Sequence, residues 1–221
     1  MKQNEQELQF LKDEINQMWK LVISQVERSK QALLAGDTER AEEVMGLEKR
    51  VDAFDLKMDS LCEHYIALYS PVAIDLRLVL SIMKISLTLE RIADYAVGIA
   101  RYVADGDCAG FFAQTKKPLE IESMFENLLS MLTDSQVAFN SENARNAGKI
   151  LAKDRKINEI YRNAFRVLNG QLQKEPAKID CGLKMILTLQ KMERVGDHCS
   201  NIVEEIAFYT EAKILKHKDR Q

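Results

Sequence analysis

The stretch Glu90-Arg91-Ile92-Ala93-Asp94 organises this chain, because it returns in the second half as Glu193-Arg194-Val195-Gly196-Asp197. A segment rich in Leu, Met and Ile precedes each copy, which predicts that both copies lie on helices. Residues four apart share one face of a helix, so the Glu and the Asp of each copy lie together and repel each other. The repeat therefore predicts a duplicated fold in which each half presents an acidic pair to a cation.

The composition favours an all-α fold. The 221 residues include only 9 Gly and 3 Pro, and so few breakers indicate long helices. With 46% hydrophobic and 29% charged residues, the chain has the balance of a soluble globular protein. The longest apolar stretch, residues 78–89, is interrupted by Lys84 and is too short to span a bilayer. Any membrane contact is therefore expected to go through a partner.

The charges and the cysteines exclude two classes of protein. The net charge is −3 and the Lys and Arg residues are scattered, so nucleic acid is not an expected partner. The cysteines show no C-x-x-C spacing and no secretory signal precedes them, so an extracellular disulfide framework is not expected. We expect reduced thiols in a cytoplasmic protein at Cys62, Cys108, Cys181 and Cys199.

Turn signals predict six helices, three on each side of Gly106. Asp37 and Ser141 are expected to cap the helices that follow them, because short polar side chains accept hydrogen bonds from the first amides of a helix. Ser70 followed by Pro71 is expected to begin the third helix in the same way.

The second predicted helix carries a sustained apolar seam, with residues alternately three and four apart. The seam consists of Val44, Leu47, Val51, Phe54, Met58, Leu61, Tyr65 and Leu68. Such a seam packs against neighbouring helices, so we expect two tandem three-helix bundles, residues 1–105 and 110–221, with few contacts between them. The third helix is apolar on most of its surface, which favours a homodimer.

An acidic stripe runs beside this seam. It consists of Glu48, Asp52, Asp55 and Asp59. When the apolar positions of the two halves are aligned, Asp154 falls on Glu48 and Asn158 falls on Asp52, so only the first two positions of the stripe are repeated. If the acidic pairs of the second and third helices face each other, four oxygen donors converge in each half. Such donors suit hard cations such as Mg²⁺, Mn²⁺ or Ca²⁺, and also iron, whereas structural zinc usually takes Cys or His.

The acidic pattern does not by itself require a metal. Acidic pairs also arise on solvated helix faces, and Arg91 and Arg194 could form salt bridges with them. His198 and Cys199 could extend the second cluster, although a partly buried polar residue is the preferred explanation of His198, because the first half has Tyr95 and Ala96 at these positions. The E-x-x-H motif of di-iron proteins is absent, as are nucleophile elbows and phosphate-binding loops, so no catalytic step is expected.

Two stretches of the chain resemble the PhoU family of phosphate-responsive regulators. The first is Ser70-Pro71-Val72-Ala73-Ile74-Asp75-Leu76-Arg77-Leu78, continuing through Leu89-Glu90-Arg91-Ile92-Ala93-Asp94-Tyr95-Ala96, and the second is Met192-Glu193-Arg194-Val195-Gly196-Asp197-His198-Cys199-Ser200-Asn201-Ile202. The resemblance implies a cytoplasmic, non-enzymatic accessory protein that damps high-affinity phosphate uptake and phosphate-starvation signalling when phosphate is plentiful. The partners that it implies are the ATPase subunit of the phosphate ABC transporter and the phosphate-sensing histidine kinase.

The resemblance also implies metal clusters, often of iron or zinc, at the acidic motifs of each bundle. By position, the ligands would be Glu48, Asp52, Glu90 and Asp94 in the first half, and Asp154, Asn158, Glu193 and Asp197 in the second. Asn158 departs from the Asp of the family pattern, so the second cluster is expected to hold its ions less tightly. Two alternatives use the same acidic clusters: a metal-storage protein or metal-dependent enzyme built on a helical bundle, and a regulator of a sodium-coupled phosphate permease.

Overall fold

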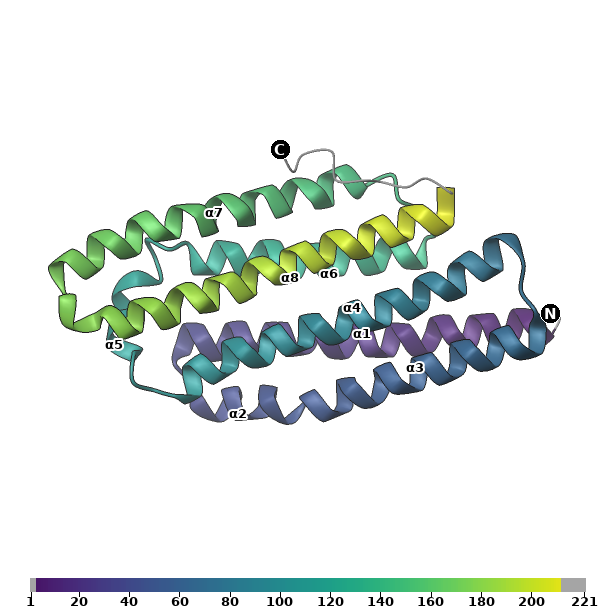
Figure 1. Cartoon of the computed structure of the whole chain (residues 1–221), viewed down its shortest axis with the longest axis horizontal. Coiled ribbons are helices and arrows are strands. Elements are labelled where there is room, and N and C mark those ends of the chain that lie inside the picture. Colours follow the sequence, from purple (N-terminus) through teal and green to yellow (C-terminus); the bar gives the residue numbers. More distant parts are fainter. Residues whose placement is uncertain (1–2, 212–221) are drawn as a thin grey trace.

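The computed structural model describes residues 3–211, and all regular structure in that range is helical (Figure 1). The α-helices are α1 (Gln3–Ala35), α2 (Thr38–Gly46), α3 (Glu48–Tyr69), α4 (Ala73–Ala104), α5 (Ala109–Thr115), α6 (Ile121–Asn140), α7 (Ala147–Lys174) and α8 (Ile179–Glu211), and a short 3₁₀ turn, η1 (Pro176–Lys178), precedes α8. Helices α1, α3 and α4 form one three-helix bundle, and α6, α7 and α8 form the other. The predicted all-α fold is therefore confirmed. None of the helices between residues 3 and 211 combines the length and the apolarity that a membrane span requires.

The predicted second helix is divided at Leu47 into α2 and α3. The amide of Leu47 donates to the Val44 carbonyl (3.2 Å), and the fully buried side chain of Gln25 on α1 donates to the same carbonyl (3.1 Å). This carbonyl is committed to a tighter turn and to a neighbouring helix, so the regular hydrogen-bond ladder of an α-helix is interrupted there. Asp37 begins the segment as predicted, because its side chain accepts a hydrogen bond from the Arg40 amide (3.0 Å).

Two other predicted helix starts are wrong, because the preceding helix continues as far as the serine in each case. Ser70 closes α3 in the left-handed region (φ 43°), with its amide still bonded to the Ile66 carbonyl (3.1 Å), and α4 begins at Ala73. Ser141 likewise ends α6, and α7 begins at Ala147. The predicted number of helices is also too low, since it omits α5 and the division between α2 and α3.

The two bundles share one hydrophobic core, because α4 and α8 pack side by side and antiparallel (Figure 1). At the middle of this contact the rings of Tyr95 and His198 stack, with their centroids 5.6 Å apart. Helices α1 and α6 also meet, and the Trp19 indole donates to the Leu132 carbonyl (3.2 Å). The expectation of few contacts between the halves is therefore wrong. Helix α8 covers part of the apolar surface of α4, but Ile74, Leu80 and Leu87 of α4 remain exposed, so the homodimer stays a prediction.

A disulfide ties the segment between the bundles to the second one. Cys108, immediately before α5, is bonded to Cys181 in the first turn of α8, with their Cα atoms 5.4 Å apart. The prediction of four reduced thiols is wrong for this pair, because spacing rules do not detect residues separated by 73 positions that the fold brings together. Cys62 and Cys199 are buried free thiols, as predicted.

Candidate metal centre

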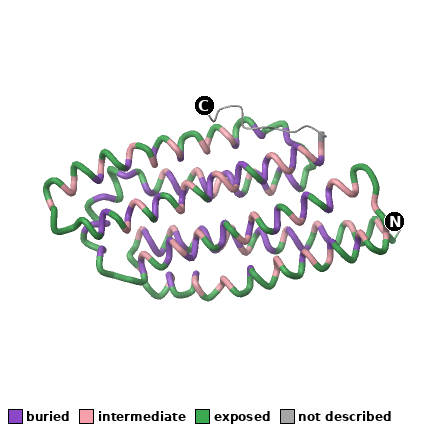
Figure 2. Tube along the Cα trace, in the orientation of Figure 1, coloured by how far each residue is buried: buried purple, intermediate pink, exposed green. Residues whose placement is uncertain are grey.

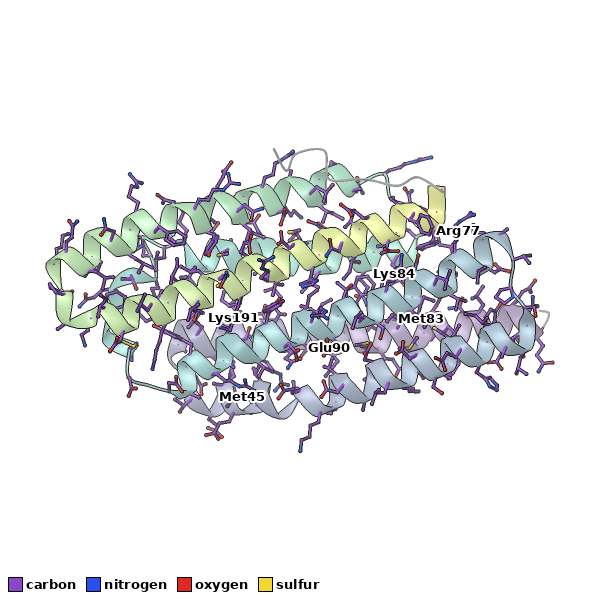
Figure 3. All side chains as sticks on the ribbon, viewed as in Figure 1. Met45, Arg77, Met83, Lys84, Glu90 and Lys191 are labelled. Atoms are coloured by element: carbon purple, nitrogen blue, oxygen red, sulfur yellow. A yellow bond between two sulfur atoms is a disulfide. The ribbon has the colours of Figure 1, made fainter. Side chains whose placement is uncertain are left out.

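Three carboxylates converge between α3 and α4 in the first bundle. One oxygen from each of Asp52, Glu90 and Asp94 lies within 4.8 Å of the others. Asp52 lies on α3, and the other two lie four residues apart on one face of α4. Figure 3 labels Glu90, which lies on α4. Asp52 and Asp94 are exposed and Glu90 is half-buried, so the group opens to the solvent and could receive an ion from it. We refer to these three residues as the first acidic site.

The acids of this site oppose one another's ionisation. The pKa of Glu90 is raised, first by burial and then by the negative charges of Asp94 and Asp55. The pKa of Asp94 is also raised, first by burial and then by the charges of Glu48 and Asp52, although Arg91 and Arg101 act in the other direction. Bound cations would relieve this repulsion. The donor set fits a hard cation, since it consists of carboxylate oxygens with no Cys or His.

Glu48, the fourth predicted ligand of the first half, stands apart from this group. It is the first residue of α3, and its Oε1 lies 3.7 Å from Nη2 of Arg101 on α4. It therefore adds negative potential at Asp94 while its own partner is a cation.

Asp55 is not among the predicted ligands, because it has no acidic counterpart in the second half. In the structure it accepts a hydrogen bond from the Ser86 hydroxyl of α4 (2.7 Å) and contributes to the raised pKa of Glu90. Its position three residues after Asp52 on the same helix was the available signal, since residues at that spacing lie on one face.

The second half uses its acids differently. Nδ2 of Asn158 donates to Oδ2 of Asp154 on the same helix, α7 (3.2 Å). On α8, Arg194 lies with Nη1 3.3 Å from Oδ2 of Asp197 and with Nε 3.8 Å from Oε2 of Glu193. Within residues 3–210, the first acidic site is the only group of three acidic, His or Cys ligand atoms this close together. In this half the arginine of the repeated phrase pairs with its acids, which is the salt-bridge alternative considered in the sequence analysis.

Glycine sets the distance between α7 and α8 beside these residues. A Cβ at Gly196 would lie 3.0 Å from Oδ1 of Asp154 and 3.3 Å from Cδ1 of Ile157. The corresponding residue of the first phrase is Ala93, and an alanine at Gly196 would require the side chains of Asp154 and Ile157 to shift by a few tenths of an ångström.

His198 and Cys199 do not extend the second acidic set. The His198 ring stacks on Tyr95, and its pKa is lowered by burial, with Arg91 the next cause. Cys199 is fully buried, and burial raises the pKa of its thiol, with the nearby Asp154 adding to the shift. A thiol in this state is a poor metal ligand, because metals bind the thiolate. Both residues serve the packing of α8.

Comparison with known proteins gives a consistent result over both bundles. The model of the family described as "PhoU domain" matches twice, over residues 15–103 and 121–206. The phosphate-specific transport system accessory protein PhoU of Escherichia coli K12 is 30% identical over 213 residues, covering 96% of this chain and 86% of that protein. The PhoU homolog of Aquifex aeolicus is 30% identical over 216 residues, which cover 96% of this chain and 95% of that protein.

Solved structures show the same fold. PhoU from Pseudomonas aeruginosa gives a TM-score of 0.87 at 26% identity, covering 96% of this chain and 100% of that one. The phosphate transport system regulatory protein PhoU from Streptococcus pneumoniae gives a TM-score of 0.85 at 28% identity, covering 97% of this chain and 100% of that one. Because the family model matches both bundles and the likeness spans nearly the whole chain in sequence and in structure, this chain belongs to the PhoU family.

Proposed function

We propose that this protein is a cytoplasmic accessory regulator of a phosphate-specific transport system, and that it works by binding other proteins rather than by catalysis. The observation that carries the proposal is the match of the PhoU domain to both bundles. Relatives that cover nearly all of the chain are named as accessory proteins of phosphate-specific transport systems. The proposed action is negative: when phosphate is plentiful, the protein reduces uptake and phosphate-starvation signalling.

The proposed partners are the ATPase subunit of the phosphate ABC transporter and the phosphate-sensing histidine kinase. Support comes from the family relationship and from the shape of the molecule, which offers long exposed helical faces. Helical faces are common recognition surfaces, because residues spaced three and four apart form a continuous stripe.

Metal binding is the second part of the proposal. Asp52, Glu90 and Asp94 would hold a hard cation such as Mg²⁺ or Mn²⁺, or an iron or zinc ion as the family resemblance implies. The ion would supply positive charge that cancels the mutual repulsion of these acids and fixes α3 against α4. The second set, Asp154, Asn158, Glu193 and Asp197, fits an ion less well, because Arg194 already supplies a positive charge there.

Deletion of the gene tests the regulatory role. In phosphate-rich medium the deletion strain is expected to keep high phosphate uptake and to express phosphate-starvation genes, and a plasmid copy should restore repression. Capture of the tagged protein from phosphate-replete cells should recover the transporter ATPase or the sensor kinase. Normal repression in the deletion strain, with neither partner recovered, would show that the proposal is wrong.

The same experiments separate the alternatives. Recovery of a sodium-coupled permease in place of the ABC transporter would favour the permease regulator. Turnover of a substrate by the purified, metal-loaded protein would favour the enzyme. Elemental analysis of the untagged protein identifies the ion in each case.

A further inference from the structure

Helix α7 is strongly basic, and it lies at one edge of the molecule (Figure 1). It contains seven Lys and Arg residues and two acids. Helices α2 and α3, at the opposite edge, contain four basic and eight acidic residues. The chain as a whole carries a net charge of −3, so α7 forms a positive edge on an acidic protein.

The cations of α7 lie on its outward side. The helix packs mainly against α6 and α8, and exposed positions recur along its length (Figure 2). Arg155, Arg162 and Arg166 follow one another at intervals of seven and four residues, so they form one row along the helix. Lys149 and Lys156, which are seven residues apart, form a second row beside the first. We call these five exposed residues the α7 basic face.

The five cations keep their charge available to an external anion. Within residues 3–210, none of them forms an ion pair, whereas the half-buried Lys153 of the same helix pairs with Asp134 of α6. Arg166 donates from Nη2 to Oδ1 of Asn163 (2.8 Å), but this amide oxygen carries no charge that would neutralise the guanidinium. The face is therefore not already satisfied by the chain itself.

Few acids offset these cations. On α7 itself, Asp154 is half-buried and lies beside Gly196 of α8, and Glu159 is exposed among the cations. Helix α6 exposes Glu122 and Glu126. The axes of neighbouring helices lie about 8–10 Å apart, which is close to the Debye length of about 8 Å at physiological salt. The face therefore keeps an excess of positive charge toward the solvent.

The α7 basic face has no apolar anchor. The residues between its two rows are Ala152, Glu159 and Asn163, and none of them is large and apolar. Phe165 is 55% exposed, but it immediately precedes Arg166 and so lies about 100° around the helix from it. Protein–protein interfaces depend on buried aromatic and apolar side chains, and linear polyanions lie in basic grooves. A protruding helix with rows of cations offers neither, whereas it suits a flat anionic surface.

We infer that the α7 basic face binds the surface of a membrane that contains anionic phospholipids, with its Lys and Arg side chains among the headgroups and no segment inserted into the acyl chains. The inference departs from the expectation that membrane contact goes only through a partner. It does not depend on the proposed function, because lipids alone supply the binding surface. The acids of α2 and α3 lie at the far edge of the molecule, beyond the Debye length, so they do not prevent this contact.

The test is sedimentation of the full-length protein with vesicles, either of phosphatidylcholine alone or of phosphatidylcholine and phosphatidylglycerol in equal amounts. The main variant is Arg155→Gln with Arg162→Gln, which removes two cations of the face. A second variant, Arg155→Lys with Arg162→Lys, keeps the charge. The control, Lys49→Gln with Arg50→Gln, removes two exposed cations from α3. Circular dichroism and thermal melting confirm that each variant is folded.

Wild type is expected to sediment with the mixed vesicles but not with phosphatidylcholine alone, and salt should release it. Each Lys or Arg near an anionic surface contributes roughly 5-fold in affinity, so the Gln variant should bind about 20-fold more weakly. The Lys variant and the α3 control should each change binding by less than about 3-fold.

Four outcomes would overturn the inference. Wild type that does not prefer the mixed vesicles has no anionic membrane surface as its target. A folded Gln variant that binds as wild type does, or an α3 control that loses as much affinity, would show that α7 is not the contact. A Lys variant as weak as the Gln variant would indicate a site for the guanidinium group rather than a charged face. A Gln variant that keeps vesicle binding but no longer captures the transporter ATPase would make the occupant a protein.

Discussion

The two halves of this molecule carry the same Glu-Arg-x-x-Asp phrase and give it different electrostatic solutions. In the first half, Glu90 and Asp94 meet Asp52 from the neighbouring helix, and the negative charge accumulates. In the second half, Arg194 turns back onto Glu193 and Asp197 and neutralises them locally. The comparison teaches that a repeated motif preserves a helix and a face, whereas the neighbours of that face decide whether it attracts an external cation.

The largest expected effect comes from separating the halves. We retain residues 1–105 and 110–221 as the two repeat units, but each would expose an apolar flank of α4 or α8 when expressed alone. Each fragment should keep helical circular dichroism, yet its melting temperature should fall by at least about 20 °C or its transition should lose cooperativity. The two fragments, mixed, should recover a cooperative transition and elute together in gel filtration.

A fragment that melts cooperatively near the temperature of the whole chain would contradict the shared core. A matched comparison is available within the second half, since residues 106–221 keep Cys108 and residues 110–221 do not. The longer fragment should be the more stable of the two under oxidising conditions and equal to the shorter one in reductant.

The disulfide should give the next largest effect, and it belongs to the second half. The bond closes a loop between residues 73 positions apart, for which the chain-entropy model predicts about 4 kcal/mol of stabilisation. Cys108→Ser with Cys181→Ser should therefore lower the melting temperature by roughly 10 °C. Reductant should lower the melting temperature of wild type and leave the double variant unchanged. Equal melting of wild type with and without reductant, after thiol titration confirms the change, would count against the bond.

The next prediction compares the two halves by how much Mn²⁺ affinity is lost when the acids of each half are neutralised. Glu90→Gln with Asp94→Asn should weaken Mn²⁺ binding by about 100-fold, because affinity for hard cations follows the number of charged ligands. Glu193→Gln with Asp197→Asn should change it by less than about 3-fold. Isothermal titration calorimetry on apo protein measures both. The reverse order would show that the arginine pairs open readily and that the second set is the true site.

Asn158→Asp sharpens the same comparison. The substitution restores the acid that the family pattern expects, but it leaves Arg194 in place and removes the hydrogen bond to Asp154. We expect only a few-fold gain in Mn²⁺ affinity in the second half. A large gain would mean that the amide, rather than the arginine, limits this half.

The smallest expected effect is the pH dependence of stability without metal. The pKa of Glu90 is raised in the folded state, so the folded protein binds protons more tightly there than the unfolded chain does. The stability contributed by the protonated form is therefore lost as pH rises above about 4. Glu90→Gln, in chelator, should be more stable than wild type at neutral pH by a few tenths of a kcal/mol and should lose this advantage in acid. Urea unfolding of wild type and Glu90→Gln at a series of pH values from acidic to neutral measures the difference in their free energies of unfolding.

Glu193→Gln is the matched control for this experiment. Its carboxylate lies beside Arg194, so its removal should leave neutral-pH stability unchanged or slightly lower. If both Gln variants gain stability equally, the two halves do not differ in their electrostatics as described.

Much of this fold could be predicted because it depends on local pattern. The break at Gly106 and the cap at Asp37 follow from neighbouring residues, and the structure keeps them. The predicted seam is buried or half-buried from Val44 to Tyr65, but its last member, Leu68, is 61% exposed, so the prediction is wrong for that residue. The division at Leu47 was not predicted, and the Val44 carbonyl beside it accepts a hydrogen bond from a side chain of another helix, Gln25, which local pattern does not reveal.

The candidate site likewise has features that follow from local sequence and features that depend on tertiary packing. The spacing of Glu90 and Asp94 predicted their shared face, and alignment of the halves found Asp52. The pairing of Glu48 with Arg101 depends on the rotamers of both side chains and on which turn of α4 lies opposite Glu48 on α3. Local sequence does not determine how the two helices pack. The disulfide is tertiary for the same reason, since only the folded chain brings Cys108 to Cys181.

The packing of α4 on α8 has the form of an isologous interface held within one polypeptide. Tyr95 meets His198, which is its own counterpart in the other repeat, as residues on a two-fold axis do in a homodimer. In a true homodimer every substitution at such a contact appears twice, so both sides must tolerate it. Covalent fusion of the two repeats removes that constraint. Lys191 lies over Gly98, whereas at the equivalent contact Thr88 corresponds to Lys191 and Asn201 corresponds to Gly98. A symmetric contact has thus become free to specialise, one side at a time.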